Sequence, residues 1–99
     1  MRKNGWLKHF PISTQVNFRD DERNQRTIME VTTGDQPGLL AKIAAALVKN
    51  GIRLQNAKIA TFGERAEDIF FITDRELQPI TDQARRGKLK DTIVEMLGQ

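Results

Sequence analysis

The sequence predicts an α+β sandwich in which a four-stranded antiparallel sheet carries two helices on one face. Segments with strand and helix patterns follow one another in the order β-β-α-β-β-α. The consecutive apolar run in residues 66–73 is typical of a central strand. A right-handed strand–helix–strand crossover leaves room for one strand between the two that it joins. We therefore place residues 66–73 between strands 27–32 and 52–61, and residues 12–18 on the outer side of 27–32.

The first half of the chain contains two strands and a helix. Residues 12–18 alternate apolar and polar side chains, as a half-buried strand does. Residues 19–26 are all polar and are predicted as a loop, so that strand 27–32 pairs antiparallel with the first. A helix is predicted from Pro37 to Asn50, followed by Gly51 as a stop signal. Its apolar face repeats at three- and four-residue spacing through Leu39, Leu40, Ile43, Ala44, Leu47 and Val48.

The third predicted strand, residues 52–61, changes its apolar phase part-way. The apolar positions are even up to Leu54 and odd from Ala57 onward. One extra residue in the strand would produce this switch, so we expect a β-bulge near Gln55 and Asn56.

The last part of the chain contains a turn, a strand and a helix. Residues 62–65 are predicted as a turn before the strand 66–73. Thr81 or Asp82 can cap the second helix. Gly87 weakens its first half, so the prediction is firm for residues 88–97.

Composition fits one domain and excludes several classes of protein. The chain has 99 residues, of which 38% are apolar, enough for a hydrophobic core. No run of about 18 apolar residues is present, so no membrane span or membrane partner is expected. The lack of cysteine excludes disulfides and cysteine metal sites and fits a reducing cytoplasm. We expect residues 1–9 to be a flexible lead-in and residues 10–97 to form a single domain.

The charge pattern argues against a nucleic-acid partner. The net charge is +3, but charges of both signs alternate over residues 19–23 and 63–68. A nucleic-acid-binding domain usually gathers its positive charge on one face. The short basic clusters at residues 2–3 and 85–88 are interpreted as solvated surface.

The junction between strand 27–32 and the first helix is the predicted functional site. It places the free N–H groups and partial positive charge of a helix start at the end of a strand. Asp35 or Gln36 can turn the chain, and Pro37 suits the first helical turn. Gly38 allows a ligand to approach the backbone closely. A ligand carboxylate could meet the helix start while Asp35 meets an ammonium group.

Residues 35–40 (Asp-Gln-Pro-Gly-Leu-Leu), followed by Gly51-Ile52 and by Ala-Lys-Ile-Ala-Thr at 57–61, resemble the ACT domain. Residues 63–70 and the Ile-Thr-Asp at 72–74 are similar to the C-terminal ACT domain of bacterial PII uridylyltransferase/uridylyl-removing enzymes. The resemblance covers residues 9–97 and implies a ferredoxin-like ACT sandwich. The usual ACT order is β-α-β-β-α-β, and this chain has no room for a strand after the second helix. The N-terminal strand would replace that usual last strand.

The resemblance implies a regulatory domain that binds a small effector, an amino acid with glutamine favoured. The ligand would lie between two ACT units, either in tandem or in a homodimer. The strand equivalent to 52–61 would supply the other wall through Gln55, Asn56 and Lys58, the last at a position where arginine is common. These residues join six from the loop as the predicted ligand site: Asp35, Gln36, Pro37, Gly38, Leu39 and Leu40.

No catalytic, metal or cofactor site is predicted in this chain. It contains neither a Gly-Ser nucleotidyltransferase motif with paired aspartates nor a His-Asp metal motif, and His9 is its single histidine. By resemblance, the effector would act on the catalytic parts of a parent enzyme and shift it between uridylylation and deuridylylation of PII.

Other interpretations remain open. The domain could be an assembly module that pairs with a second copy and binds no small ligand. A ferredoxin-like enzyme of the acylphosphatase kind ranks last, since no phosphate-cradling arginine loop is evident. Glu64, Arg65, Glu67 and Asp68 are interpreted as a surface charge network or a domain contact rather than as a catalytic carboxylate pair. Phe70 and Phe71 are interpreted as core residues rather than RNA-stacking aromatics.

Overall fold

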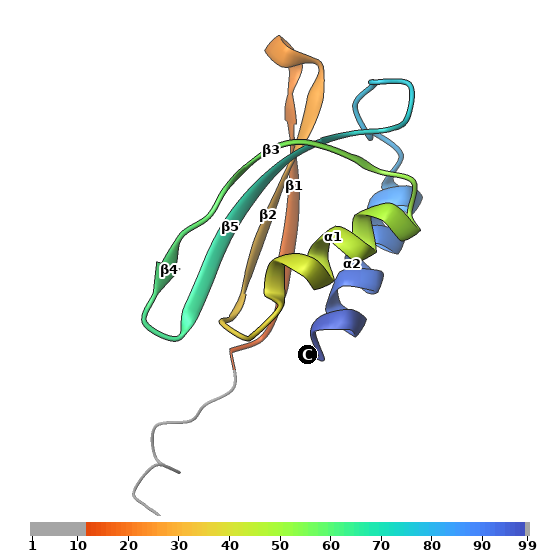
Figure 1. The fold of residues 1–99 in the computed structure, drawn as a ribbon. Coiled ribbons are helices and arrows are strands. Elements are labelled where there is room, and N and C mark those ends of the chain that lie inside the picture. Colours follow the sequence, from red (N-terminus) through yellow and green to blue (C-terminus); the bar gives the residue numbers. More distant parts are fainter. Residues whose placement is uncertain (1–11, 99) are drawn as a thin grey trace, which may run out of the picture.

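The computed structural model describes residues 12–98, which form one antiparallel sheet and two α-helices (Figure 1). Strands pair in the order β1-β2-β5-β3, and the short β4 pairs with β5. The predicted α+β sandwich with a central fourth strand is therefore confirmed, because β5 lies between β2 and β3. The strands are β1 (Gln15–Asp21), β2 (Arg26–Gly34), β3 (Arg53–Lys58), β4 (Thr61–Phe62) and β5 (Arg65–Thr73). The helices are the short 3₁₀ helix η2 (Glu22–Asn24), α1 (Leu39–Lys49) and α2 (Gln83–Leu97).

The N-terminal strand lies on the outer side of β2, in the place predicted for it. Its bounds were wrong, because β1 runs three residues further than expected and pairs Asp21 with Arg26. Half of the polar stretch predicted as a loop, residues 19–21 and 26, is therefore strand. Polar residues tolerate this position because this end of the hairpin is largely exposed. The connection shrinks to η2 and Gln25, whose left-handed backbone (φ 53°) closes it.

The first helix starts later than predicted. Pro37 does not occupy its first turn, because the chain first makes a tight turn in which Leu39 N–H donates to the Gln36 carbonyl at 3.3 Å. Gly38 follows with a positive φ of 73° and is the residue that precedes the helix. The predicted stop is confirmed: Asn50 caps the helix, and Gly51 has a φ of 68°.

The third predicted strand contains the expected bulge. The register between β3 and β5 shifts between Leu54 and Asn56. This confirms the reason for the phase switch in the sequence. The strand does not continue unbroken, since residues 59–60 separate β3 from β4.

The second helix begins earlier than the firmly predicted part. The Asp82 carboxylate accepts a hydrogen bond from the Ala84 N–H at 3.0 Å, so Asp82 is the cap. Gly87 lies inside the helix and does not end it. The cap therefore offsets a residue whose helix propensity is poor.

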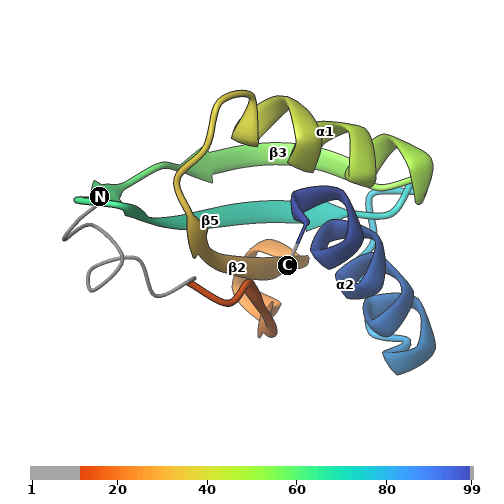
Figure 2. The same cartoon turned by 90° about the horizontal axis from the view of Figure 1, so that it is seen from below.

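Both helices lie on one face of the sheet, and the core lies between them and the strands (Figure 2). Strand side chains reach this core from alternate positions, as the period of two requires. Phe70 is among them, which confirms its predicted packing role. The buried cluster consists of Val16, Met29, Val31, Leu39, Ile43, Ala46, Leu47, Ile52, Ala66, Phe70, Ile72, Ile80, Leu89, Ile93 and Leu97.

Side chains, not a helix, cover part of the opposite face. Phe71 is only 8% exposed. The Arg26 guanidinium lies 4.3 Å from its ring centroid and Lys58 Nζ lies 5.8 Å from it. Long basic side chains thus shield an aromatic ring while their charged ends stay near water.

Within residues 12–98, no helix combines the length and apolar character needed to cross a bilayer. The predictions for residues 1–9, including the lead-in and His9, lie outside the described residues.

Candidate functional site

The start of α1 is built by the turn that precedes it. Gly38 has the positive φ and a ψ of 15° expected at the third position of a type II turn, where glycine is favoured. A Cβ at Gly38 would meet nothing within 4 Å, so backbone conformation and not crowding requires glycine there. Asp35 N–H donates to the Glu64 carbonyl at 2.8 Å, which holds this loop against the β4–β5 turn.

Within residues 12–98, no side chain caps the N-terminus of α1. No acidic residue lies in its first turn. Its positive end therefore keeps free donor capacity toward the adjoining space. This is the electrostatic feature that the sequence predicted at the junction.

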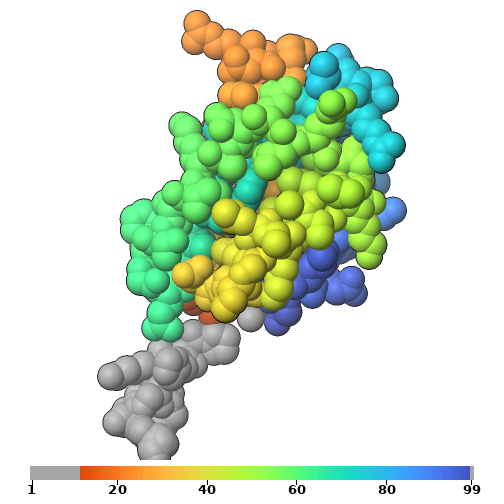
Figure 3. Space-filling view, in the orientation of Figure 1, coloured from red at the N-terminus to blue at the C-terminus, as the bar shows by residue number. Residues whose placement is uncertain are grey.

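A cavity of ≈ 290 Å³ opens beside this helix start. Figure 3 shows the first turns of α1 (yellow) on the same face as the β3–β4 segment (green), with β5 (teal) visible between them. The lining comes from the loop, α1, the β3–β4 connection and β5. It comprises Asp35, Gln36, Gly38, Leu39, Leu40, Ala41, Ile59, Thr61, Ala66 and Asp68. Its volume is near the lower end of small-ligand sites, about 300–1,000 Å³.

Asp68 is the buried acid of this cavity. It lies between Ala66 and Phe70 in the row of β5 that faces the helices, and it is 2% exposed. The Ala60 N–H donates to Asp68 Oδ1 at 3.3 Å. Burial raises the pKa of Asp68 above its ordinary value, and the negative charge of Asp35 raises it further, against the Ala60 hydrogen bond that lowers it.

Sequence reasoning missed Asp68 as part of the site. It grouped this residue with its exposed neighbours as a surface charge network, and burial contradicts that grouping. Arg65 and Glu67 do form such a contact at the surface, with 2.8 Å between Arg65 Nε and Glu67 Oε2. The period of two in β5 was the available signal, because it puts residue 68 in the same row as 66, 70 and 72.

The structure brings five of the predicted loop residues to the cavity: Asp35, Gln36, Gly38, Leu39 and Leu40. Pro37 lies between them in the chain and does not line it. The Gln36 side chain is already engaged, since its Oε1 accepts from Lys42 Nζ at 2.6 Å and its Nε2 donates to the Leu97 carbonyl at 3.4 Å. Gln36 therefore links the loop to both helices.

Gln55, Asn56 and Lys58 do not line this cavity. Ala57 packs against the core, so strand alternation turns its neighbours at 56 and 58 to the other face. Lys58 lies near Phe71 there, and Asn56 Oδ1 accepts from the Ala57 N–H at 2.8 Å. Ile59 and Thr61 line this cavity beyond the end of β3. The odd-numbered apolar phase after Ala57 could have indicated Ile59.

An apolar groove of ≈ 220 Å³ adjoins the cavity and shares Leu40 and Ile59 with it. It runs between α1 and β3, which is an edge strand. Leu40, Leu54 and Ile59 are 48%, 47% and 49% exposed. The full lining is Leu40, Ala44, Leu47, Leu54, Ala57, Ile59 and Phe70. Exposed apolar side chains beside an unpaired strand edge are typical of an association surface.

The described residues hold no group of three or more histidine, cysteine, aspartate or glutamate side chains placed to bind a metal ion. The acids of the cavity are Asp35 and Asp68, and its remaining lining is apolar or uncharged. A few polar groups among apolar side chains are typical of a small-molecule site.

Comparison with known proteins gives a consistent result. Residues 27–88 match the family model of the ACT domain. The chain is 49% identical over 92 residues to a bifunctional uridylyltransferase/uridylyl-removing enzyme of Methylococcus capsulatus, covering 93% of this chain and 10% of the relative. Enzymes of the same name from Ectopseudomonas mendocina and Pseudomonas entomophila are 46% identical over 93 residues and 47% identical over 91 residues, covering 94% and 92% of this chain.

The chain thus spans about a tenth of the length of the curated relatives it matches, 10% for each of these three. No solved structure was found to match it.

Proposed function

The chain belongs to the ACT domain family, and we propose that it is the effector-binding ACT domain of a bacterial uridylyltransferase/uridylyl-removing enzyme. The similarity extends over almost the whole chain, which supports this assignment. Catalysis would belong to other parts of the parent enzyme. This chain would be a non-catalytic regulatory domain in the cytoplasm.

The effector would be an amino acid, with glutamine as the first candidate. One observation carries this proposal: a single cavity combines an uncapped helix start with two carboxylates. The helix start favours a carboxylate, and Asp35 and Asp68 favour an ammonium group. An α-amino acid carries both groups on one carbon atom.

Regulation would follow from how the bound effector pairs two ACT units. The cavity opens beside the apolar groove and the β3 edge, so a second ACT unit docked there could close over the ligand. An effector that binds the paired arrangement more tightly would bias the attached catalytic parts by that difference in affinity. The output would be a shift between uridylylation and deuridylylation of PII.

A second candidate function is assembly without a small ligand. The groove favours it, because its lining is apolar and three of its large side chains are about half exposed. In that case the domain would pair with another copy through the groove and β3, and the cavity would hold no effector.

Calorimetric titration of the 99-residue chain with glutamine, and then with other amino acids, tests the first proposal. Saturable binding of glutamine supports effector sensing. Absence of heat with every amino acid, together with a stable dimer in sedimentation equilibrium, would leave assembly as the function.

The role of the groove can be tested separately. Leu54→Arg places a charge on the groove, whereas Val48→Arg places one on the α1 surface outside it, where Val48 is 74% exposed. We expect only Leu54→Arg to shift sedimentation toward the monomer. Equal behaviour of both variants would contradict pairing through this surface.

A further inference from the structure

Asp68 occupies a position that strands usually give to an apolar residue. Its neighbours in the same row of β5, Ala66 and Phe70, belong to the hydrophobic core. A buried carboxylate is costly unless hydrogen bonds and an opposite charge compensate for the water it has lost. Within residues 12–98, the side-chain carboxylate of Asp68 receives one hydrogen bond, from the Ala60 N–H.

The charged groups around Asp68 offer it no cation. Asp35 carries the same sign and faces the same cavity. The ammonium group of Lys42, on α1, donates a hydrogen bond to Gln36 Oε1. Lys58, although close in sequence to Ala60, lies over Phe71 on the opposite face of the sheet. The carboxylate therefore lacks a counter-charge from the described part of the chain.

The cavity presents two opposite electrostatic walls. The start of α1 is its positive wall, and Asp68 with Asp35 forms its negative wall. A simple anion would face two carboxylates, and a simple cation would face the helix start. A zwitterion can place its negative group at the helix start and its positive group at the aspartates in one orientation.

We propose that Asp68 is the buried anionic anchor of the effector site and binds the ammonium group of an α-amino acid whose carboxylate meets the N–H groups at the start of α1. This inference rests on the proposed effector function and adds the residue and chemical group that decide which ligands are accepted. Asp35, which is exposed, would be a secondary contact.

The alternative is that Asp68 only ties the β3–β4 connection to β5 through Ala60. Asp68→Asn separates the two roles, because the amide oxygen can still accept the Ala60 N–H while the negative charge is lost. The control is Glu67→Gln, the same change on the adjacent residue, whose side chain pairs with Arg65 at the surface.

The experiment is calorimetric titration of each 99-residue variant with glutamine and with glutaramic acid, the analogue that lacks the α-ammonium. We expect the wild-type protein to prefer glutamine. Asp68→Asn should weaken glutamine binding about ten- to a hundredfold, the size expected for one charge-assisted hydrogen bond. The same substitution should hardly change the affinity for glutaramic acid. The Glu67→Gln variant should bind both ligands as the wild type does.

The outcomes separate the two proposals. If the wild type binds glutamine and Asp68→Asn binds it equally well, the role of Asp68 is overturned while the effector function stands. If the wild type binds no amino acid, both fail.

A second measurement needs no variant. Carboxyl-carbon NMR of the wild-type protein should show the pKa of Asp68 falling when glutamine saturates the site, since a nearby ammonium favours the charged carboxylate. A pKa that glutamine leaves unchanged would overturn the proposal, even if Asp68→Asn proves too unstable to study.

Discussion

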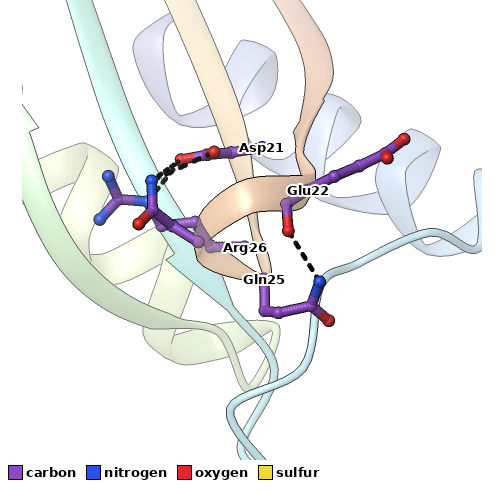
Figure 4. Close-up of polar contacts among 5 residues, drawn as sticks. Asp21, Glu22, Gln25 and Arg26 are labelled. Carbon is purple, nitrogen blue, oxygen red and sulfur yellow. Dashed lines mark hydrogen bonds and ion pairs between the residues drawn. The ribbon is translucent and has the colours of Figure 1, made fainter.

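The two ends of the sheet each hold an aspartate, and the pKa values of the two carboxyl groups are shifted in opposite directions. At the β1–β2 end, Asp21 accepts from Arg26 Nε at 2.9 Å (Figure 4). It also accepts from Asn24 Nδ2 at 3.0 Å. The Arg26 hydrogen bond, followed by that of Asn24, lowers the pKa of Asp21. At the other end, burial raises the pKa of Asp68, which has a single backbone donor.

The difference separates a structural carboxylate from a candidate binding carboxylate. The β1–β2 end is complete in itself: Gln25 Nε2 also donates to the Glu22 carbonyl at 2.7 Å, so side chains close the hairpin locally. The α1 end keeps an uncapped helix start and a buried acid beside a cavity. Perturbed acids in a cavity favour a functional site, whereas a perturbed acid in an ion pair favours a structural role.

The largest effect is expected from Ile72→Ala, which tests whether the two ends belong to one cooperative unit. Ile72 is fully buried in β5 and pairs with Thr27 on β2 and Leu54 on β3. The cavity left by the substitution should lower the free energy of unfolding by about 2–5 kcal/mol. Urea unfolding followed at both ends should still show one transition. Two separated transitions would mean that the ends fold independently, and Val48→Ala on the exposed surface is the control.

The next effect concerns the turn at the α1 end. Gly38→Ala places a Cβ on a backbone with φ 73° and should lower the free energy of unfolding by about 1–2 kcal/mol. Gly87→Ala is the matched control, because Gly87 lies inside α2 with open space around it and should stabilise by about 0.5–1 kcal/mol. Chemical denaturation measures both changes. A Gly38→Ala variant at least as stable as the wild type would show that the positive φ of Gly38 carries no cost.

A smaller effect with a distinctive pH dependence is expected from Asp68→Asn. The native pKa of Asp68 is raised above the ordinary 3.8, so the native state holds its proton more tightly than the unfolded state does. Wild-type stability should therefore fall as the pH rises from 3.8 through the raised pKa. The Asp68→Asn variant has no carboxyl group to titrate at this position, so its stability should not show this fall. Its advantage in melting temperature over the wild type should therefore grow toward neutral pH. An advantage that stays constant with pH would contradict the burial argument.

The smallest effect, opposite in sign, is expected from Asp21→Asn. The native pKa of Asp21 lies below 3.8, so its ion pair stabilises the protein above that pH, and this stabilisation is lost as the pH falls through the native pKa. In the variant, the acid-side loss of stability should be reduced, and the melting temperature near neutral pH should be slightly lower. Melts from pH 2 to 7 measure this. A variant that follows the wild type over the whole range would remove the contrast between the two ends.

Much of the fold was predictable because local patterns report it directly. The phase switch after Leu54 indicated the bulge, and the Asn50-Gly51 pair indicated the end of α1. The bounds of β1 were wrong because polarity alone suggested a loop, while pairing across to Arg26 extends the strand. Long-range pairing decides such cases, and a local pattern does not contain it.

The candidate site was predictable on its loop side and not on its strand side. Asp35, Gly38 and Leu40 follow from the motif that turns the chain into α1. Lys58 was assigned to the site by resemblance, yet strand alternation turns it to the opposite face. A polar residue in a strand belongs to one face or the other according to register, and one residue of shift exchanges the faces.

The order of the elements and the turn before α1 depend on residues that are neighbours in the chain, so the amino-acid pattern alone predicts them. The apolar run in residues 66–73, together with the rule for strand crossovers, predicts the central position of β5. Strand alternation places Asp68 in the inward-facing row, but its burial depends on tertiary packing. Its burial requires β5 to pair with β2 and β3 in one register and α1 to lie across the resulting row. The groups around the Asp68 carboxylate come from segments far apart in the sequence. Its pKa is therefore shifted only after these segments have packed together.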